Sequence, residues 1–175
     1  MFQFLIALFA SALTGLLLAA SINYIPWWFK IATDVETTTR SSLTRLEQAY
    51  DVATRAGNGV SPAVTAEPDG GFRSNFLPVL QLMPAAPAAT AWQYGQHAQD
   101  GGPFAGLHYF CLAGTSAGVD EGTWRGVNRA RAGFSDEQVF VGASCGATAS
   151  DALPSGFPAP LALTMFVAFT PGISK

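Results

Sequence analysis

The chain has 175 residues, of which 49% are hydrophobic and only 12% are charged. Soluble domains carry about 25% charged residues, so we expect much of this surface to be covered by lipid or by other protein chains. The net charge of −3 and the scattered basic residues argue against nucleic acid as a partner, because the nearest approach to a basic patch, at Arg125, Arg129 and Arg131, is interpreted as a solvated helix face.

Residues 1–29 are uncharged, and Lys30 is the first charged residue. A run of this length exceeds the ~20 residues that cross a bilayer, and it ends in Trp27-Trp28-Phe29, which is typical of a membrane interface. Three interpretations are open. The run is a signal peptide cleaved near residues 18–21, although no basic region precedes it; or it is a plain membrane anchor; or it packs among copies of itself.

From Lys30 to Ala56 the pattern becomes amphipathic, because apolar positions recur at spacings of three and four residues. These positions are Ile31, Val35, Leu43, Leu46, Tyr50 and Ala53, with Thr39 at the missing step. Gly57, followed by Asn58-Gly59, is typical of a helix end. The sequence therefore predicts one helix over 2–56, roughly 80 Å long at ~1.5 Å per residue. Its first half is apolar all round, and its second half has one apolar face.

Two residues interrupt the apolar half of this predicted helix. Pro26 lacks an N–H and clashes with the preceding helical turn, and Gly15 lowers helix stability. Either Pro26 makes a kink that lets the helix repack when it leaves lipid, or it marks the end of a membrane span.

The remainder predicts a small head domain over 58–175. Residues 57–90 are rich in Gly and Pro and predict a connecting loop that packs onto the head. Strands are expected at 90–94, 107–112, 138–143 and 161–169, the last of them central or covered because it is apolar on both faces. A short helix is expected over 120–132, although Gly122 and Gly126 weaken it.

These elements predict an α+β fold in three parts. Residues 1–29 form a hydrophobic half-helix that spans a membrane or packs among other chains. Residues 30–57 form an amphipathic half-helix, and residues 58–175 form the head. An antiparallel sheet needs a layer on its apolar face, and the amphipathic half-helix is the expected layer.

Cys111 and Cys145 are the only cysteines, and they lie in or beside two predicted strands. On the far side of a membrane-type segment, two cysteines predict one disulfide in an oxidising compartment, worth about 3 to 4 kcal/mol in the chain-entropy model. Two buried free thiols are the alternative. No histidine or further cysteine has ligand spacing, so no metal is expected.

One catalytic motif matches, because residues 142–146 read G-x-S-x-G, the nucleophile elbow of α/β-hydrolases. That fold needs a helix after the serine and a downstream histidine. Residues 147–160 are broken by Pro and Gly, and both His97 and His108 lie upstream. We interpret Ser144 as a loop serine and His108 as a packed or edge residue. No enzyme activity and no cofactor are expected.

With this plan the chain resembles a type IV pilin, or one of its minor-pilin relatives, after removal of the leader peptide. The resemblance rests on the uncharged segment from residue 1, the interruptions at Gly15 and Pro26, and the amphipathic continuation to Ala56. It also rests on the region between the cysteines, which contains Trp124-Arg125 and is similar to the disulfide-bounded region of the type IVb group.

The resemblance implies a structural subunit of a bacterial surface filament, or fimbrium, with roles in adhesion, motility or DNA transfer. The expected partners are copies of the chain or other pilins, with an inner-membrane pool before assembly. The residues expected to pack in the filament core are Phe2, Leu5, Leu8, Phe9, Leu13, Gly15, Leu16, Leu17 and Pro26.

The first residues depart from the family pattern. Pilins usually carry Glu at the fifth mature position, where it compensates the N-terminal amine of a neighbour, but this chain has Leu5 there and Met1 in place of the usual Phe. Either the mature numbering differs, or the subunit assembles without that pairing, as some tip-located minor pilins and pseudopilins do. Two alternatives to a pilin are a membrane-anchored envelope binding protein that does not polymerise and, more remotely, an exported hydrolase using Ser144.

Overall fold

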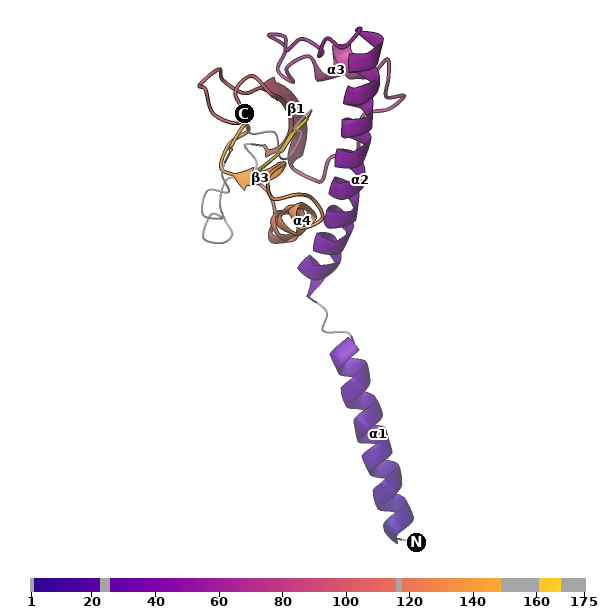
Figure 1. Cartoon of the computed structure of the whole chain (residues 1–175). Coiled ribbons are helices and arrows are strands. Elements are labelled where there is room, and N and C mark those ends of the chain that lie inside the picture. Colours follow the sequence, from indigo (N-terminus) through magenta and orange to yellow (C-terminus); the bar gives the residue numbers. More distant parts are fainter. Residues whose placement is uncertain (1, 23–25, 116–117, 149–160, 168–175) are drawn as a thin grey trace.

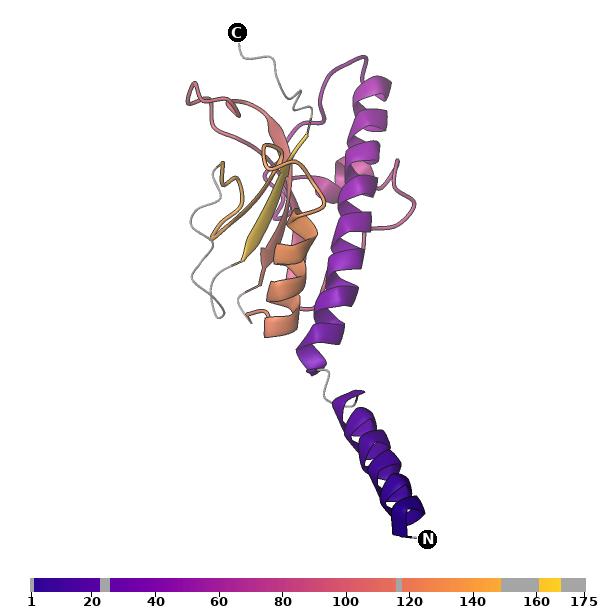
Figure 2. The ribbon, with the colours of Figure 1, turned by 60° about the horizontal axis from the view of Figure 1, so that its bottom comes forward.

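A computed structural model describes residues 2–22, 26–115, 118–148 and 161–167, and for residues 2, 5 and 19–22 it describes the backbone alone (Figure 1). The described residues form four α-helices and one four-stranded sheet. In both views a separate N-terminal helix extends away from the head, which consists of a long helix, two shorter helices and the sheet (Figures 1 and 2).

The N-terminal third of the chain forms two helices, α1 (Phe2–Ile22) and α2 (Trp27–Ala56). The prediction of one continuous helix over 2–56 is therefore wrong. Pro26 has extended backbone angles, φ −54° and ψ 135°, so it lies outside the helix and becomes the N-cap of α2. Its carbonyl oxygen accepts a hydrogen bond from the N–H of Phe29 at 2.8 Å, which begins α2. A proline at this position interrupts the helix because it offers no N–H to the preceding turn.

The amphipathic pattern of α2 is confirmed. One face of this helix is buried in the head, and the residues at its centre recur at helical spacing. The buried residues are Ala32, Val35, Thr39, Ser42, Leu43, Leu46, Ala49 and Tyr50. The helix ends at Ala56 as predicted, and the N–H of Gly57 donates a hydrogen bond to the carbonyl of Ala53 at 2.9 Å.

The four strands are β1 (Thr90–Gln96), β2 (His108–Gly114), β3 (Val139–Gly142) and β4 (Ala162–Phe166). All their pairings are antiparallel, and the order across the sheet is β1-β2-β4-β3. The predicted strands are confirmed to within a few residues, except that positions 168–169 of the last one lie outside the described residues. β4 is central, as its two apolar faces predict, because β2 and β3 pair with its two edges.

The two faces of the sheet carry different cores. The larger core lies on the face toward α2, where Tyr94, Phe110, Leu112 and Met165 pack against the buried face of the helix. On the opposite face, a smaller cluster contains Phe104, Phe140 and Phe166 with Leu107 and Tyr109 at its margin. The amphipathic helix therefore covers one face of the sheet, as expected.

Two further helices complete the head. The expected helix at 120–132 is present as α4 (Glu121–Arg131), capped by Asp120, whose carboxylate accepts a hydrogen bond from the N–H of Thr123 at 2.8 Å. A helix that the sequence did not predict, α3 (Phe72–Phe76), lies within the Gly/Pro-rich loop. Its two phenylalanines are fully buried and lie edge-on to Phe110, with ring centroids 5.8 and 5.1 Å away.

Candidate assembly surface

The most exposed apolar surface of the molecule is α1. Every α1 side chain that the structure describes is exposed, and the helix carries no charged residue. Among the predicted core-packing residues, Leu8, Phe9, Leu13, Leu16 and Leu17 expose between 55% and 72% of their surface. Soluble monomers rarely expose an apolar patch this long, and such patches mark sites of association.

Two hydroxyl groups on α1, those of Ser11 and Thr14, do not interrupt this apolar surface. Ser11 Oγ donates a hydrogen bond to the carbonyl of Leu8 at 3.0 Å, and Thr14 Oγ1 donates one to the carbonyl of Ala10 at 2.6 Å. Both hydroxyls are thus satisfied within the helix, so burying this part of α1 would leave neither donor unpaired.

The other predicted packing positions are less fully described. A Cβ atom added at Gly15 would meet nothing within 4 Å, so this glycine leaves a shallow point on the helix where another helix could approach closely. Phe2 and Leu5 lie in α1, but their side chains fall outside the described residues. Pro26 is exposed and lies at the junction with α2 rather than within a helix.

Taken over the described residues, none of the helices is both long enough and apolar enough to cross a membrane.

Where α1 joins the head, two arginines of α4 lie over two aromatic rings of α2. The guanidinium carbon of Arg125 is 4.6 Å from the centre of the Trp28 ring, and that of Arg129 is 5.1 Å from the centre of the Phe29 ring. We call these four residues the collar. Arg125 also binds Glu121 through an ion pair at 2.8 Å. Cation–π contacts at such sites contribute about 0.5–1 kcal/mol each, so the collar fixes the first turn of α2 against α4.

The interpretation of the three arginines as a solvated helix face holds only in part, because Arg125 is exposed but all three arginines also have partners within the head. Arg125 and Arg129 cover aromatic rings, and Arg131 donates hydrogen bonds to the carbonyl of Val139 at 3.3 Å and to Asp136 at 3.0 Å. Sequence spacing could show only that Arg125 and Arg129 share a helix face. Their aromatic partners lie about a hundred residues earlier in the chain, and the partners of Arg131 lie beyond the end of the helix.

The two glycines that weaken α4 are the points where it approaches α2 most closely. A Cβ atom added at Gly122 would lie 2.7 Å from Cβ of Ile31, and one added at Gly126 would lie 2.6 Å from both the carbonyl oxygen of Ala32 and Cβ of Val35. Real Cβ atoms do not approach this closely. The lost helix propensity is thus offset by backbone packing that a larger residue would prevent.

Arg40 of α2 binds the other end of α4. Its guanidinium donates hydrogen bonds to the carbonyls of Ala130 at 3.3 Å and Arg129 at 3.1 Å, and it pairs with Glu36 at 2.9 Å. A cation on these carbonyls satisfies acceptors that a helix end leaves free and complements the helix dipole. The two helices are therefore held together along their length.

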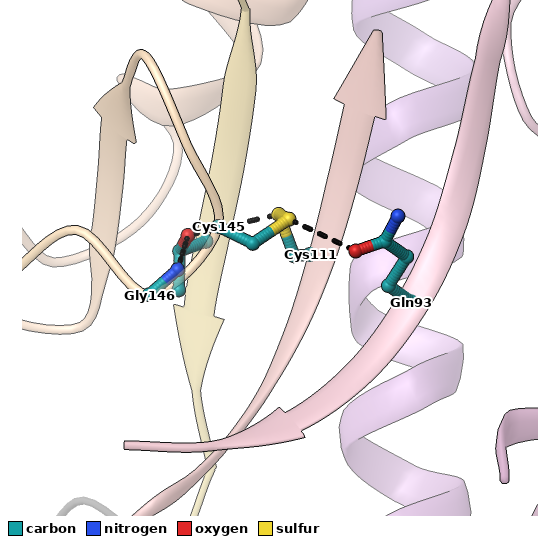
Figure 3. Close-up of a disulfide and its surroundings, with 5 residues drawn as sticks. Gln93, Cys111, Cys145 and Gly146 are labelled. Carbon is teal, nitrogen blue, oxygen red and sulfur yellow. Dashed lines mark hydrogen bonds between the residues drawn. A yellow bond between two sulfur atoms is a disulfide. The ribbon is translucent and has the colours of Figure 1, made fainter. Parts of the chain in front are cut away.

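The predicted disulfide is confirmed between Cys111 and Cys145, whose Cα atoms are 5.6 Å apart (Figure 3). It lies on the sheet face opposite α2, in polar surroundings. The N–H of Gly146 donates to Oγ1 of Thr164 at 3.0 Å, and that hydroxyl lies 3.8 Å from the Cys111 sulfur. Gln93 Oε1 lies 3.5 Å from the Cys145 sulfur. The bridge therefore fixes the segment after β3 to β2, across the intervening β4.

The serine of the G-x-S-x-G motif is exposed in the loop after β3. It lines a cavity of about 280 Å³ together with residues of the β2 and β4 ends, and neither histidine lines it. His108 instead stacks on Tyr94, with ring centroids 5.5 Å apart, and burial lowers the pKa of its imidazole. His97 lies edge-on to Phe166 on the other face of the sheet. The structure thus does not bring a base to Ser144 among the residues it describes.

Among the described residues, no group of three His, Cys, Asp or Glu side chains is placed to hold a metal ion. Comparison of the chain with known protein families, with characterised proteins and with solved structures gave no match.

Proposed function

We propose that this chain is the structural subunit of a type IV pilus-like bacterial surface filament, in which α1 packs among the α1 helices of other copies or of other pilins. The observation that carries the proposal is the exposed, uncharged surface of α1. Removing a leucine or phenylalanine side chain from water contributes about 1.5–3 kcal/mol, so several such residues on one helix strongly favour a covered state.

The mixture of large and small side chains on α1 favours burial of this helix against the helices of other subunits. Large side chains at Leu13, Leu16 and Leu17 alternate with small residues such as Ala12 and Gly15. Small residues let helix backbones approach, and larger ones then fill the space between them. Before assembly the same helix would rest in the inner membrane, so assembly would exchange lipid contacts for helix contacts.

The absence of a carboxylate in α1 bears on how such subunits would align. With Leu5 in place of Glu, α1 has no carboxylate that could form an ion pair with a neighbouring amine. Subunit register would then depend on side-chain packing along α1 and on contacts between heads. This arrangement fits a minor or tip-located subunit as well as a major one.

The test replaces Leu16 with Asp, and in a second variant Leu17. A buried carboxylate in a helix bundle costs several kcal/mol, so filaments should be lost while the head remains folded. Electron microscopy of sheared surface material measures the filaments, and an intact disulfide in the recovered chain reports the folded head. Val60→Asp, an exposed position of the head, is the matched control and should leave filaments unchanged.

Normal filaments from Leu16→Asp cells would contradict the proposal. The alternative function, a membrane-anchored envelope binding protein, predicts that the unaltered chain never enters filaments. Sheared material from wild-type cells that lacks this chain would support that alternative.

A further inference from the structure

A cleft lined by residues of β1 and of the loops before it runs beside the free edge of β1. It has a volume of about 720 Å³, within the range of sites that bind small ligands or short peptides. One part of its wall is polar, at Glu67, Asp69 and Arg73, and another part is apolar, at Met83, Pro84 and Ala86. The floor is the segment Thr90–Gln93 of β1.

β1 is an edge strand, and two hydrogen bonds from the described residues pair its outward backbone groups. The N–H of Tyr94 donates to the carbonyl of Asp69 at 3.0 Å, and the N–H of Thr90 donates to the carbonyl of Pro87 at 3.1 Å. Alternate residues of a strand point their N–H and C=O groups to the same edge, so the main chain of Trp92, between these two, faces outward as well.

No hydrogen bond from the N–H of Trp92 closes this edge within the described chain, and Trp92 lines the cleft. The loops therefore pair the N–H groups on both sides of Trp92, whose own N–H and C=O have no hydrogen bond among the described residues, although Trp92 as a whole is only 4% exposed. Unpaired groups on a strand edge are the template on which an added strand forms.

We propose that this cleft binds an extended peptide segment of another protein, which adds to β1 as a short strand and carries a basic side chain beside an apolar one. The backbone of such a segment would pair with the N–H and C=O of Trp92. The apolar side chain would contact Met83, Pro84 and Ala86.

The charge of the cleft favours a basic side chain in the segment. Glu67 is exposed and forms no ion pair among the described residues, whereas Arg73 lies 3.8 Å from Asp69 and is offset by it. The net charge of the polar wall is therefore negative. A lysine or arginine of the bound segment would complement Glu67.

This site is separate from α1, so it does not depend on filament assembly. Its residues belong to the head alone.

The experiment uses the full chain in detergent micelles and a fluorescein-labelled peptide, Val-Thr-Val-Thr-Lys-Lys, with binding measured by fluorescence anisotropy against empty micelles. The same peptide N-methylated at its two central amides cannot form the strand hydrogen bonds and should bind about tenfold or more weakly. A peptide ending in Glu-Glu tests the charge preference and should also bind more weakly.

Matched variants locate the peptide. Ala86→Trp fills the cleft and should reduce affinity at least about tenfold, whereas Ala88→Trp, an exposed change outside the lining, should not. Glu67→Lys should weaken binding of the lysine peptide, whereas Glu137→Lys makes the same charge change elsewhere and should leave it unaltered. Absence of binding at millimolar peptide, or binding that is unaffected by N-methylation or by Ala86→Trp, would overturn the proposal.

Discussion

At the scale of single residues, Gly126 determines how closely α2 and α4 pack. Alanine would gain about 1 kcal/mol of helix propensity over glycine, but its Cβ would lie 2.6 Å from the Ala32 carbonyl and from Val35. We expect Gly126→Ala to destabilise the head by about 1–3 kcal/mol, measured by urea denaturation. Gly15→Ala, which meets nothing within 4 Å, is the control and should leave head stability unchanged. A Gly126→Ala head as stable as wild type would contradict the close approach.

His108 makes the stability of the head depend on pH. Burial against Tyr94 lowers the pKa of the folded imidazole below its ordinary value of 6.5, so the unfolded chain binds the proton more readily. The stability contributed by neutral His108 is present above pH 6.5 and is lost as the pH falls toward the folded pKa. We therefore expect the melting temperature to fall between pH 7.5 and pH 5, and to fall less in His108→Gln.

The control for this prediction is Val60→Ala, a change at an exposed position with no titratable side chain, for which the pH dependence should match that of the unaltered chain. An equal drop in melting temperature for His108→Gln and the unaltered chain would show that other groups account for the pH dependence.

At the scale of elements, the collar is expected to stabilise the start of α2, which has no side-chain cap. Replacing Arg125 and Arg129 together with Gln removes both cation–π contacts and should cost about 1–2 kcal/mol of unfolding free energy. Arg73→Gln, at an exposed position on α3, is the control in the same urea titration. If the double variant has the same free energy of unfolding as the control, the two aromatic rings are held by packing alone.

The disulfide stabilises the head mainly by restricting the unfolded chain. For a separation of 34 residues the chain-entropy model gives about 3 to 4 kcal/mol. The Cys111→Ser/Cys145→Ser variant should lose that much unfolding free energy, measured by urea denaturation. An unaltered urea midpoint would contradict this estimate.

Local patterns in the sequence predicted the elements that depend on near neighbours. The buried face of α2 followed from its apolar spacing, and the four strands followed from short apolar runs between turns. The break at Pro26 was harder to predict, since the same residue also allows a kinked but continuous helix. α3 was not predicted because it lies in a Gly/Pro-rich loop, where the four-residue spacing of Phe72 and Phe76 was the only sign of a helical turn.

Contacts between distant segments could not be predicted from local patterns. The aromatic rings that the collar arginines contact lie about a hundred positions earlier in the chain. The glycines of α4 are needed there only because α2 packs closely against them. Of the candidate site, composition predicted the apolar surface of α1, whereas the cleft beside β1 depends on loops that meet only in the folded head.

At the scale of the whole molecule, α1 and the head divide the chain into two parts. No α1 side chain that the structure describes is buried, so the head should not need α1 for its core. We expect a chain lacking residues 1–25 to fold, with an intact disulfide and native near-ultraviolet circular dichroism, and to be monomeric by light scattering. A truncated chain that is unfolded or aggregated would contradict this division.

The place of β4 in the sheet has a consequence for the order in which the head is completed. β4 is the last of the described strands along the chain, yet it lies between β2 and β3, with the Cys111–Cys145 bridge spanning it on one face. The ribosome delivers both cysteines before residues 162–166. If the two cysteines are oxidised early, β4 must pair with β2 and β3 after the disulfide has already closed the loop between residues 111 and 145. If they are oxidised late, the disulfide forms over a β4 strand that is already paired. The timing of the oxidant thus decides which of two routes a newly made head follows.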